Sequence, residues 1–416
     1  TNTANNNTFI DSSTNAFTIT RNGNSTQGSL SPYLSGWSNY FDTNSYLTVS
    51  PTTALALGSG DYTIELWVNI TAFTSYGTFI TTYNNATTAG AGFFRINAST
   101  QQWQWQNGAN GSATNFKSFN SSTNLTAGKW HHLAVVRSGT TVTMYQDGVN
   151  VGGGTDIETL VAPNCTIGEA VNGYGLNGYL SNLRIIKGTA LYTANFTPPS
   201  ASLTAVANTQ LLTCQNNRFV DNSSNALTVA TTGTPSVYRF NPFNPSAAYS
   251  SATYGGSGYF DGTGDYLSGP TNTATAFNLS GDFTVECWAY FNSVSTSFAG
   301  MMAWADGSGW NGWQFLNNAG TITFQFLTGS AGAGTVTSST AVKVGQWYHI
   351  AVCRSGSTET LYLNGVSVGT ATYSTPQTSA SSYLRIGVDR TNVYFTNGYL
   401  ADCRVINGTA VYTGCL

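Results

Sequence analysis

The chain has 416 residues, of which only 7% are charged and 13% are aromatic, and its formal net charge is −3. The length is comfortable for two domains of about 200 residues, and the aromatic residues supply enough apolar area for packed cores. This near-neutral charge argues against a nucleic-acid partner, and no run of about 18 apolar residues predicts a membrane-spanning helix.

Apolar and polar residues alternate at a period of two in several segments, which predicts β-strands. In residues 61–68 (DYTIELWV), Glu65 and Trp67 point to one face and Leu66 to the other. Residues 130–137 (WHHLAVVR) alternate in the same way. No apolar stripe with a helical period is longer than two turns. The chain is therefore predicted to be all-β.

Two segments carry a two-residue turn between strands. Residues 144–151 (MYQDGVNV) contain Asp147-Gly148, and residues 361–368 (LYLNGVSV) contain Asn-Gly at the same place. Both dipeptides favour a type I′ turn, which needs two positive φ angles. We expect a β-hairpin at each position.

The two halves of the chain repeat each other in the same order. Residues 128–153 match residues 345–370 without gaps, at 15 of 26 positions. The spacing is far longer than the 20–50 residues typical of solenoid repeats. We predict two tandem domains, residues 1–200 and 213–416, joined by a linker at about 197–212.

The second half contains four strings that resemble the laminin G-like, concanavalin A-like group of jelly-roll domains: YFDGTGDYLSGP, FTVECWAY, GQWYHIAVCRSGSTETLYLNGVSVG and GYLADCRVINGTAVY. The first half carries matching strings, including NGYL at residue 177. The resemblance implies that each half is a concanavalin A-like jelly-roll β-sandwich. Members of this group mostly bind glycans, other proteins or calcium. Tandem copies with such a connector also resemble large virion or surface proteins of marine bacteriophages.

Some relatives on this fold are glycoside hydrolases, which need a pair of carboxylates. The corresponding strands here carry a single glutamate each, Glu65 and Glu286. We therefore expect no enzymatic activity. Glu65 with His132, and Glu286 with His349, are interpreted as structural pairs that tie neighbouring strands together; an acid–imidazole site is the alternative.

Tryptophans are the candidate ligand-binding residues. Trp103 and Trp105 share one face of a predicted strand, and Trp310 and Trp313 lie in the comparable region of the second half. Exposed indole rings can stack on the apolar faces of sugars. For Trp103 and Trp105, burial in the sandwich core is an equal alternative.

Recurring aspartates at predicted strand ends are the candidate calcium ligands, as the resemblance implies: Asp42, Asp61, Asp261 and Asp282. Turn and capping hydrogen bonds to the backbone are the other explanation. The cysteines do not recur as a disulfide framework. One bridge remains open, between Cys214 and Cys415, which begin and end the predicted second domain.

Repetition favours a protein that acts through multivalent binding. We expect a non-catalytic extracellular or virion-surface protein that binds carbohydrate or mediates adhesion, as a fragment of a longer fibre, decoration or adhesin chain. Its partners would be a surface glycan or other copies of itself. A structural spacer or filament-forming protein without a ligand is the alternative.

Overall fold

The computed structural model describes residues 9–28, 36–74, 76–83, 92–108, 116–169, 173–239, 243, 255–271, 275–307, 310–329, 332–374 and 382–413. The chain forms two compact units, which are named here the first sandwich (residues 35–246) and the second sandwich (residues 1–34 and 247–416). Apart from two short 3₁₀ turns, η1 (Thr53–Leu55) and η2 (Thr275–Phe277), the regular structure in these ranges is β-strand. The prediction of two β-sandwiches is confirmed.

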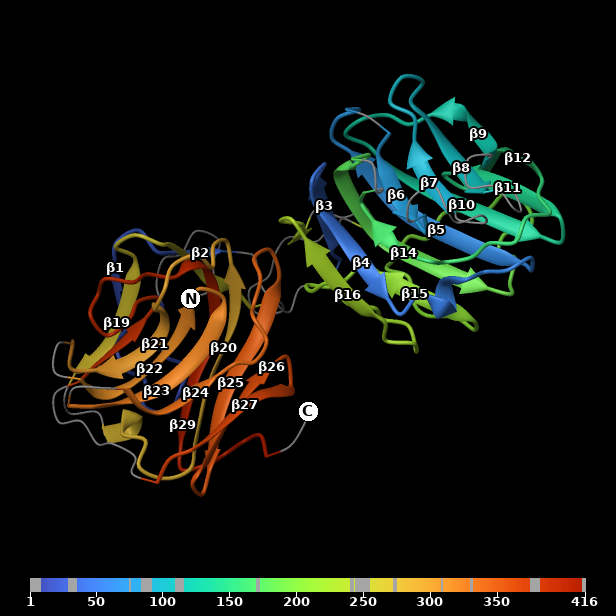
Figure 1. The fold of residues 1–416 in the computed structure, drawn as a ribbon. Coiled ribbons are helices and arrows are strands. Elements are labelled where there is room, and N and C mark those ends of the chain that lie inside the picture. The colour runs from blue at the N-terminus through green and yellow to red at the C-terminus, as the bar shows by residue number, and fades with distance from the viewer. Residues whose placement is uncertain are drawn as a thin grey trace. The chain divides into compact units, whose positions relative to one another are not determined.

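The first sandwich consists of two sheets (Figure 1). One sheet has the order β12 (Val149–Thr155), β11 (Thr141–Gln146), β10 (Trp130–Ser138), β5 (Tyr62–Ile70), β14 (Asn177–Lys187), β3 (Ser38–Asp42) and β17 (Ser236–Tyr238), with β15 (Thr209–Thr213) also paired to β14. The opposing sheet has the order β16 (Thr228–Thr232), β4 (Tyr46–Ser50), β13 (Thr166–Ile167), β6 (Thr78–Thr81), β7 (Gly92–Ile96), β8 (Gln102–Gly108) and β9 (Phe116–Asn124).

The second sandwich repeats this arrangement with seven strands in each sheet. One of its sheets has the order β2 (Thr26–Gly28), β18 (Ser257–Asp261), β29 (Asn397–Asn407), β20 (Phe283–Phe291), β25 (Trp347–Ser355), β26 (Thr358–Leu363) and β27 (Val366–Thr372). The opposing sheet has the order β1 (Thr20–Asn22), β19 (Tyr266–Thr271), β28 (Tyr383–Ile386), β21 (Ala299–Ala305), β22 (Asn311–Asn318), β23 (Thr321–Thr328) and β24 (Gly332–Thr337).

The cores follow from the alternation of side chains along the strands. On β5, Ile64, Leu66 and Val68 are at most 4% exposed and face the opposing sheet. Both predicted hairpins form: Asp147 and Asn364, which begin the turns, each have a φ of 51° and are followed by a glycine with positive φ. Among the described residues, no helix is long and apolar enough to cross a membrane.

The domain boundaries differ from the prediction. Strands β15, β16 and β17, which follow the expected linker, pair with β14, β4 and β3 of the first sandwich. In Figure 1, the yellow-green β16 runs beside the blue β4. The expected linker at 197–212 therefore packs on the first sandwich, and the prediction of domains at 1–200 and 213–416 is wrong.

The N-terminal residues play the same part in the second sandwich. Strand β1 pairs with β19, and β2 pairs with β18. Residues 9–20 (FIDSSTNAFTIT) and 219–230 (FVDNSSNALTVA) are copies of each other. We name residues 9–28 and 209–238 the completing segments, because each adds strands to both sheets of a sandwich.

Candidate functional site

The outer face of the β12–β17 sheet in the first sandwich carries a row of aromatic rings that points away from the core. Tyr40 on β3 lies opposite Tyr179 on β14, which in turn lies opposite Asn69 on β5. Asn69 lies opposite Trp130 on β10. The alternation along β3 explains the placement, since the neighbouring Phe41 is fully buried in the core.

Two of these rings, Tyr40 and Tyr179, form with Tyr238 on β17 what we name the tyrosine cluster. Ring centroids of Tyr40 and Tyr179 lie 5.0 Å apart, and the Tyr238 ring from β17 lies 5.8 and 5.6 Å from them. Tyr238 is 42% exposed, and the other two rings are partly exposed. The cluster is thus a partly exposed aromatic surface at one end of the sheet.

Burial raises the pKa of two tyrosines of the cluster, Tyr40 and Tyr179. Burial and the nearby charge of Asp42 raise the pKa of Tyr40. Burial, together with the neighbouring tyrosines, raises the pKa of Tyr179. Both hydroxyl groups therefore stay protonated at neutral pH, where they can donate and accept hydrogen bonds.

The second sandwich has the same row, but less of it reaches solvent. Tyr259 lies opposite Tyr399, which lies opposite Tyr290. Tyr290 is 7% exposed, and Trp347 beyond it is fully buried. Tyr238 pairs with Ser38, the first residue of β3, and Gly28 pairs with Ser257, the first residue of β18. The second sandwich therefore has a glycine where the first has Tyr238.

Three of the predicted ligand-binding tryptophans lie in the cores. Trp103, Trp105 and Trp313 are 0%, 3% and 0% exposed. Trp103 Nε1 donates to Gln146 Oε1 at 3.0 Å, and Trp313 Nε1 donates to the Phe277 carbonyl at 2.9 Å. Their strands turn this face toward the opposing sheet, so these indoles cannot stack on a sugar, and the prediction for them is wrong.

Trp310 differs from the other three because it is partly exposed. The guanidinium of Arg390 lies 3.8 Å from the centre of its ring and covers one indole face. Arg390 is itself held by the Gly307 carbonyl, which accepts a hydrogen bond from Nη1 at 2.6 Å. A sugar could reach only the other face of Trp310, so this residue stays a prediction.

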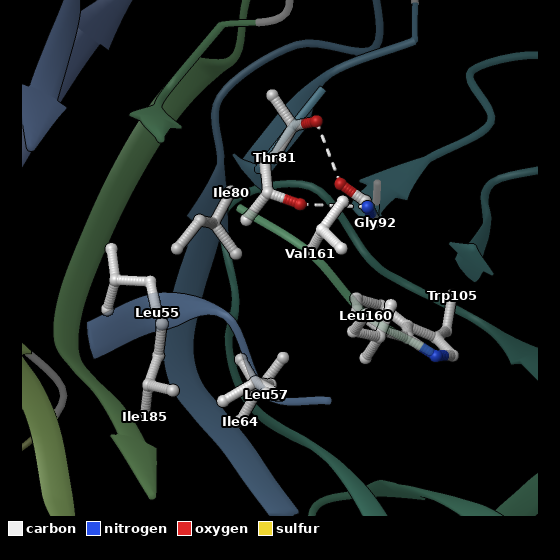
Figure 2. Close-up of a pocket in the computed structure, with 11 residues that line it drawn as sticks. Leu55, Leu57, Ile64, Ile80, Thr81, Gly92, Trp105, Leu160, Val161 and Ile185 are labelled. Atoms are coloured by element: carbon white, nitrogen blue, oxygen red, sulfur yellow. Dashed lines mark hydrogen bonds between the residues drawn. The ribbon is translucent and has the colours of Figure 1, made fainter. Parts of the chain in front are cut away.

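Trp105 also lines a small cavity between the sheets of the first sandwich (Figure 2). Its volume is about 20 Å³, and its walls are mainly aliphatic side chains such as Leu57, Leu160 and Ile185. The Thr81 hydroxyl on its rim donates to the Gly92 carbonyl at 2.8 Å. A space of this size holds about one water molecule, so the cavity is a packing void rather than a sugar site.

The first structural pair belongs to a buried network around Glu65, which is fully buried. Nε2 of His132 lies 3.2 Å from Glu65 Oε2, and the Tyr192 hydroxyl donates to the same oxygen at 2.8 Å. Arg184 donates to Oε1 from Nε at 2.8 Å. Burial alone would raise the pKa of Glu65, but the hydrogen bond from His132 and the charge of Arg184 hold it below its usual range.

The second pair sits in a matching network. Nε2 of His349 lies 2.9 Å from Glu286 Oε2, and the Tyr412 hydroxyl donates to that oxygen at 2.7 Å. Burial would raise the pKa of Glu286, but hydrogen bonds from His349, Tyr412 and Arg404 lower it to about 2. In both sandwiches the carboxylate is fully occupied by protein groups, which suits a structural role.

The predicted calcium ligands act as turn and loop acceptors. Asp42 accepts from Asn44 N, Asp261 from Thr263 N, Asp61 from Gly139 N and Asp282 from Gly356 N. In the described parts of the chain, no three acidic, histidine or cysteine side chains gather as a metal site. The four aspartates thus make the backbone hydrogen bonds of the alternative explanation, and calcium binding stays a prediction.

The predicted disulfide loses its basis. Cys214 is buried in the first sandwich, whereas residues 247–416 belong to the second. Cys415 lies outside the described residues. The two cysteines therefore do not open and close one domain, as the pairing assumed.

Sequence reasoning missed the tyrosine cluster although the sequence carries a signal for it. Tyr40 and Tyr179 recur as Tyr259 and Tyr399, each flanked by a buried apolar residue. A tyrosine at an outward position of a strand in both repeats indicates a surface row.

The sequence profile of the concanavalin A-like lectin/glucanases superfamily matches residues 41–192 and 261–410. A comparison with curated protein sequences gave no match.

Solved structures are similar at low identity. A protein from Bacteroides ovatus described as carbohydrate-binding is 14% identical, with a TM-score of 0.37; the match covers 52% of this chain and 63% of that one, less than two thirds of its length. The mouse laminin alpha1 chain, domains LG4-5, is 12% identical, with a TM-score of 0.30 and coverage of 93% and 96%. The SAP-like pentraxin from Limulus polyphemus is 13% identical, with a TM-score of 0.37 and coverage of 50% and 96%.

The two profile matches fall one in each sandwich. Each matched stretch has the two-sheet β-architecture described above. The chain therefore belongs to the concanavalin A-like lectin/glucanase superfamily.

Proposed function

We propose that the chain is a non-catalytic carbohydrate-binding or adhesion protein, and that the tyrosine cluster of the first sandwich is its sugar-binding surface. The observation that carries the proposal is the group of three tyrosines, with ring centroids 5.0–5.8 Å apart, partly exposed on one sheet face. Aromatic rings with a polar group suit ligands that are apolar on one side and hydroxylated at the edge.

The setting of the cluster supports the same reading. Only 7% of the chain is charged, so recognition would depend on stacking and neutral hydrogen bonds rather than on ion pairs. The superfamily contains both lectins and glucanases, and the carboxylates of Glu65 and Glu286 are occupied within structural networks. We propose an extracellular or virion-surface location, where a repeated weak binder gains avidity.

The test is binding of the purified chain to a broad glycan array, followed by titration calorimetry with the sugar selected. We expect the Tyr238→Ala variant to bind at least tenfold more weakly, because the most exposed ring is lost. Tyr40→Phe should keep most of the affinity if stacking dominates. Binding should not change when a calcium chelator is added.

A matched control is Trp310→Ala in the second sandwich. If that variant loses binding and Tyr238→Ala does not, the sugar site lies at Trp310 and the proposal is wrong. If the chain binds no glycan on the array, the structural alternative is favoured, a spacer or filament-forming protein without a ligand.

A further inference from the structure

The first sandwich buries an asparagine beside an aspartate at the end of strand β8. Asn107 on β8 and Asp156, which directly follows β12, are both 0% exposed. Nδ2 of Asn107 donates a hydrogen bond to Asp156 Oδ2, and the amide oxygen of Asn107 has no hydrogen-bond partner among the described residues. The backbone N–H of Glu158 donates to Asp156 Oδ1 at 2.9 Å. The carboxyl group is therefore held in place against the amide nitrogen.

A lysine faces Asn107 from the neighbouring strand. Lys117 on β9 lies directly opposite Asn107 in the register of the two strands. It points to the same side of β9 as Phe119, and its Nζ lies 5.9 Å from the centre of that ring. The Phe119 ring packs on Gly154 of β12, where an added Cβ would lie 3.1 Å from Cε1. Since Asp156 follows Gly154 by two residues, Lys117 and Asp156 approach Asn107 from two sides.

Aromatic rings surround this group of polar side chains. The rings of Tyr62 and Trp105 lie 6.1 Å apart, and both residues are at most 3% exposed. Burial and the charge of Asp156 raise the pKa of the Tyr62 hydroxyl. Among the described side chains, none forms an ion pair with Lys117. The lysine is therefore not committed to a structural salt bridge.

The second sandwich fills the same three positions with apolar packing. Strands β23 and β24 hold the places of β8 and β9 in the sheet, and Tyr373 follows β27 as Asp156 follows β12. The rings of Phe326 on β23 and Tyr373 stack with their centroids 5.2 Å apart. Gly334 on β24 lies against the Tyr373 ring, where an added Cβ would collide with it. The fold thus brings the three positions together, and its packing does not require polar residues there.

We propose that Lys117 and Asn107 become joined by an isopeptide bond, with Asp156 as the proton carrier. The neutral amine Nζ attacks Cγ of the amide, the Nζ–Cγ bond forms, and the Cγ–Nδ2 bond breaks. Asp156 takes a proton from Nζ and passes it to Nδ2, which leaves as ammonia. One amide replaces another, so the reaction needs no oxidant, reductant or further reactant.

The observed geometry suits each part of this step. Directly opposite residues on antiparallel strands have Cβ atoms about 5 Å apart, and rotation about its own side-chain bonds lets a lysine span such a gap. Oδ2 of Asp156 already accepts a hydrogen bond from Nδ2 of Asn107, the nitrogen that must be protonated to leave.

The bond would fasten a strand at the end of a sheet. In the described part of the chain, β9 is the last strand of its sheet, next to β8. Strands at sheet edges have pairing on one side only and open more easily than central strands. A covalent tie between Lys117 and Asn107 would keep β9 paired, and it does not depend on sugar binding by the tyrosine cluster.

Mass spectrometry of the denatured full chain tests the proposal. We expect an intact mass that is lower than the sequence mass by one ammonia molecule. Trypsin should not cleave after Lys117, because an acylated lysine is no longer a substrate. The digest should contain residues 96–129 as one peptide with the same mass deficit, and its fragment ions should place the bond between Lys117 and Asn107.

An alternative loss of ammonia has a different signature. Asn107 is followed by Gly108, and an Asn-Gly pair can close on its own backbone as a succinimide. That product leaves Lys117 open to trypsin and is hydrolysed in mild base, whereas an isopeptide bond survives both treatments. A deficit with the properties of a succinimide would overturn the proposal, and so would the full sequence mass.

Three variants assign the roles. Lys117→Arg removes the nucleophile and Asp156→Asn removes the proton carrier, so both should show the full sequence mass. Lys129→Arg, at an exposed lysine of the same peptide, is the matched control and should keep the deficit. Far-UV circular dichroism checks folding, and Lys117→Arg, at a partly exposed position, decides the test if Asp156→Asn does not fold. A deficit that persists in Lys117→Arg, or in folded Asp156→Asn, would overturn the proposal.

Discussion

At the scale of single residues, the least expected group is Glu359 on β26. Its side chain is fully buried, and neither carboxylate oxygen has a hydrogen-bond partner. Desolvation raises its pKa to about 8, although the charge of Arg354 opposes the shift. The first sandwich has Val142 at the corresponding place opposite Arg137. A carboxyl group thus occupies a position that an apolar side chain fills in the other copy.

This placement predicts a stability that falls with rising pH. The folded pKa of about 8 lies above the ordinary value of 4.5, so folding retains a proton between these pH values. Stability should be greatest below pH 4.5 as far as Glu359 is concerned, and should decline by up to about 1.4 kcal/mol per pH unit as the pH rises to about 8. Glu359→Gln should remove this dependence and stabilise the second sandwich at pH 8.

Urea unfolding of both proteins at pH 5 and pH 8 checks the prediction, with fluorescence and hydrogen exchange to assign the transition. Val142→Ile, at the matching place in the first sandwich, is the control and should leave the pH dependence unchanged. A wild-type second sandwich that is equally stable at both pH values would contradict the assignment.

The two glutamate networks allow a paired prediction. Glu65→Gln leaves the buried Arg184 without its counter-charge, which costs about 3–5 kcal/mol. Glu286→Gln should cost less, about 1–3 kcal/mol, because Arg404 is 55% exposed and remains hydrated. Calorimetry of the two variants measures the difference. Equal losses would show that solvent access to the arginine does not set the cost.

Prediction at the level of residues succeeded where it stated only which side chains share one face of a strand. The Glu65 and Trp67 face was inferred from alternation, and Trp67 does lie against His132, with ring centroids 5.2 Å apart. It failed for Trp103, Trp105 and Trp313, because alternation states which residues share a face but not which face points inward. Large aromatic rings release the most free energy when they are buried, which decided against exposure.

At the scale of elements, the Asp-Gly and Asn-Gly hairpins and the alternating strands could be predicted because their signals are local. The pairing of β15, β16 and β17 with the preceding sandwich could not be predicted in this way. Strand pairing over long sequence distances leaves no local pattern. The repeated sequence alone does not decide whether residues after the expected linker join the preceding or the following sandwich.

At the scale of the whole molecule, each sandwich depends on a completing segment, but the segments enter from opposite directions along the chain. In the first sandwich, residues 209–238 follow their host strands; in the second, residues 9–28 precede theirs and are separated from them by the entire first sandwich. The completing segments pair with equivalent strands in the two sandwiches, but they are joined to those strands differently along the chain.

The dependence can be tested by removing residues 1–28. Phe9, Phe17 and Ile19 pack on the core of the second sandwich, and the Phe17 ring lies 5.5 Å from that of Phe277. Loss of these contacts and of two edge strands should destabilise the second sandwich by roughly 3 kcal/mol or more, which lowers its unfolding temperature by about 6–12 °C. The first sandwich has its own completing segment and should unfold as before.

Calorimetry combined with hydrogen exchange separates the two sandwiches. Exchange should become faster in β18 and β19, the partners of β2 and β1, and should stay unchanged in β3 and β4. A shorter deletion of residues 1–8 keeps both strands and serves as the control. If the longer deletion leaves β18 and β19 protected, the second sandwich is complete without residues 9–28, and the equivalence of the two completing segments does not extend to stability.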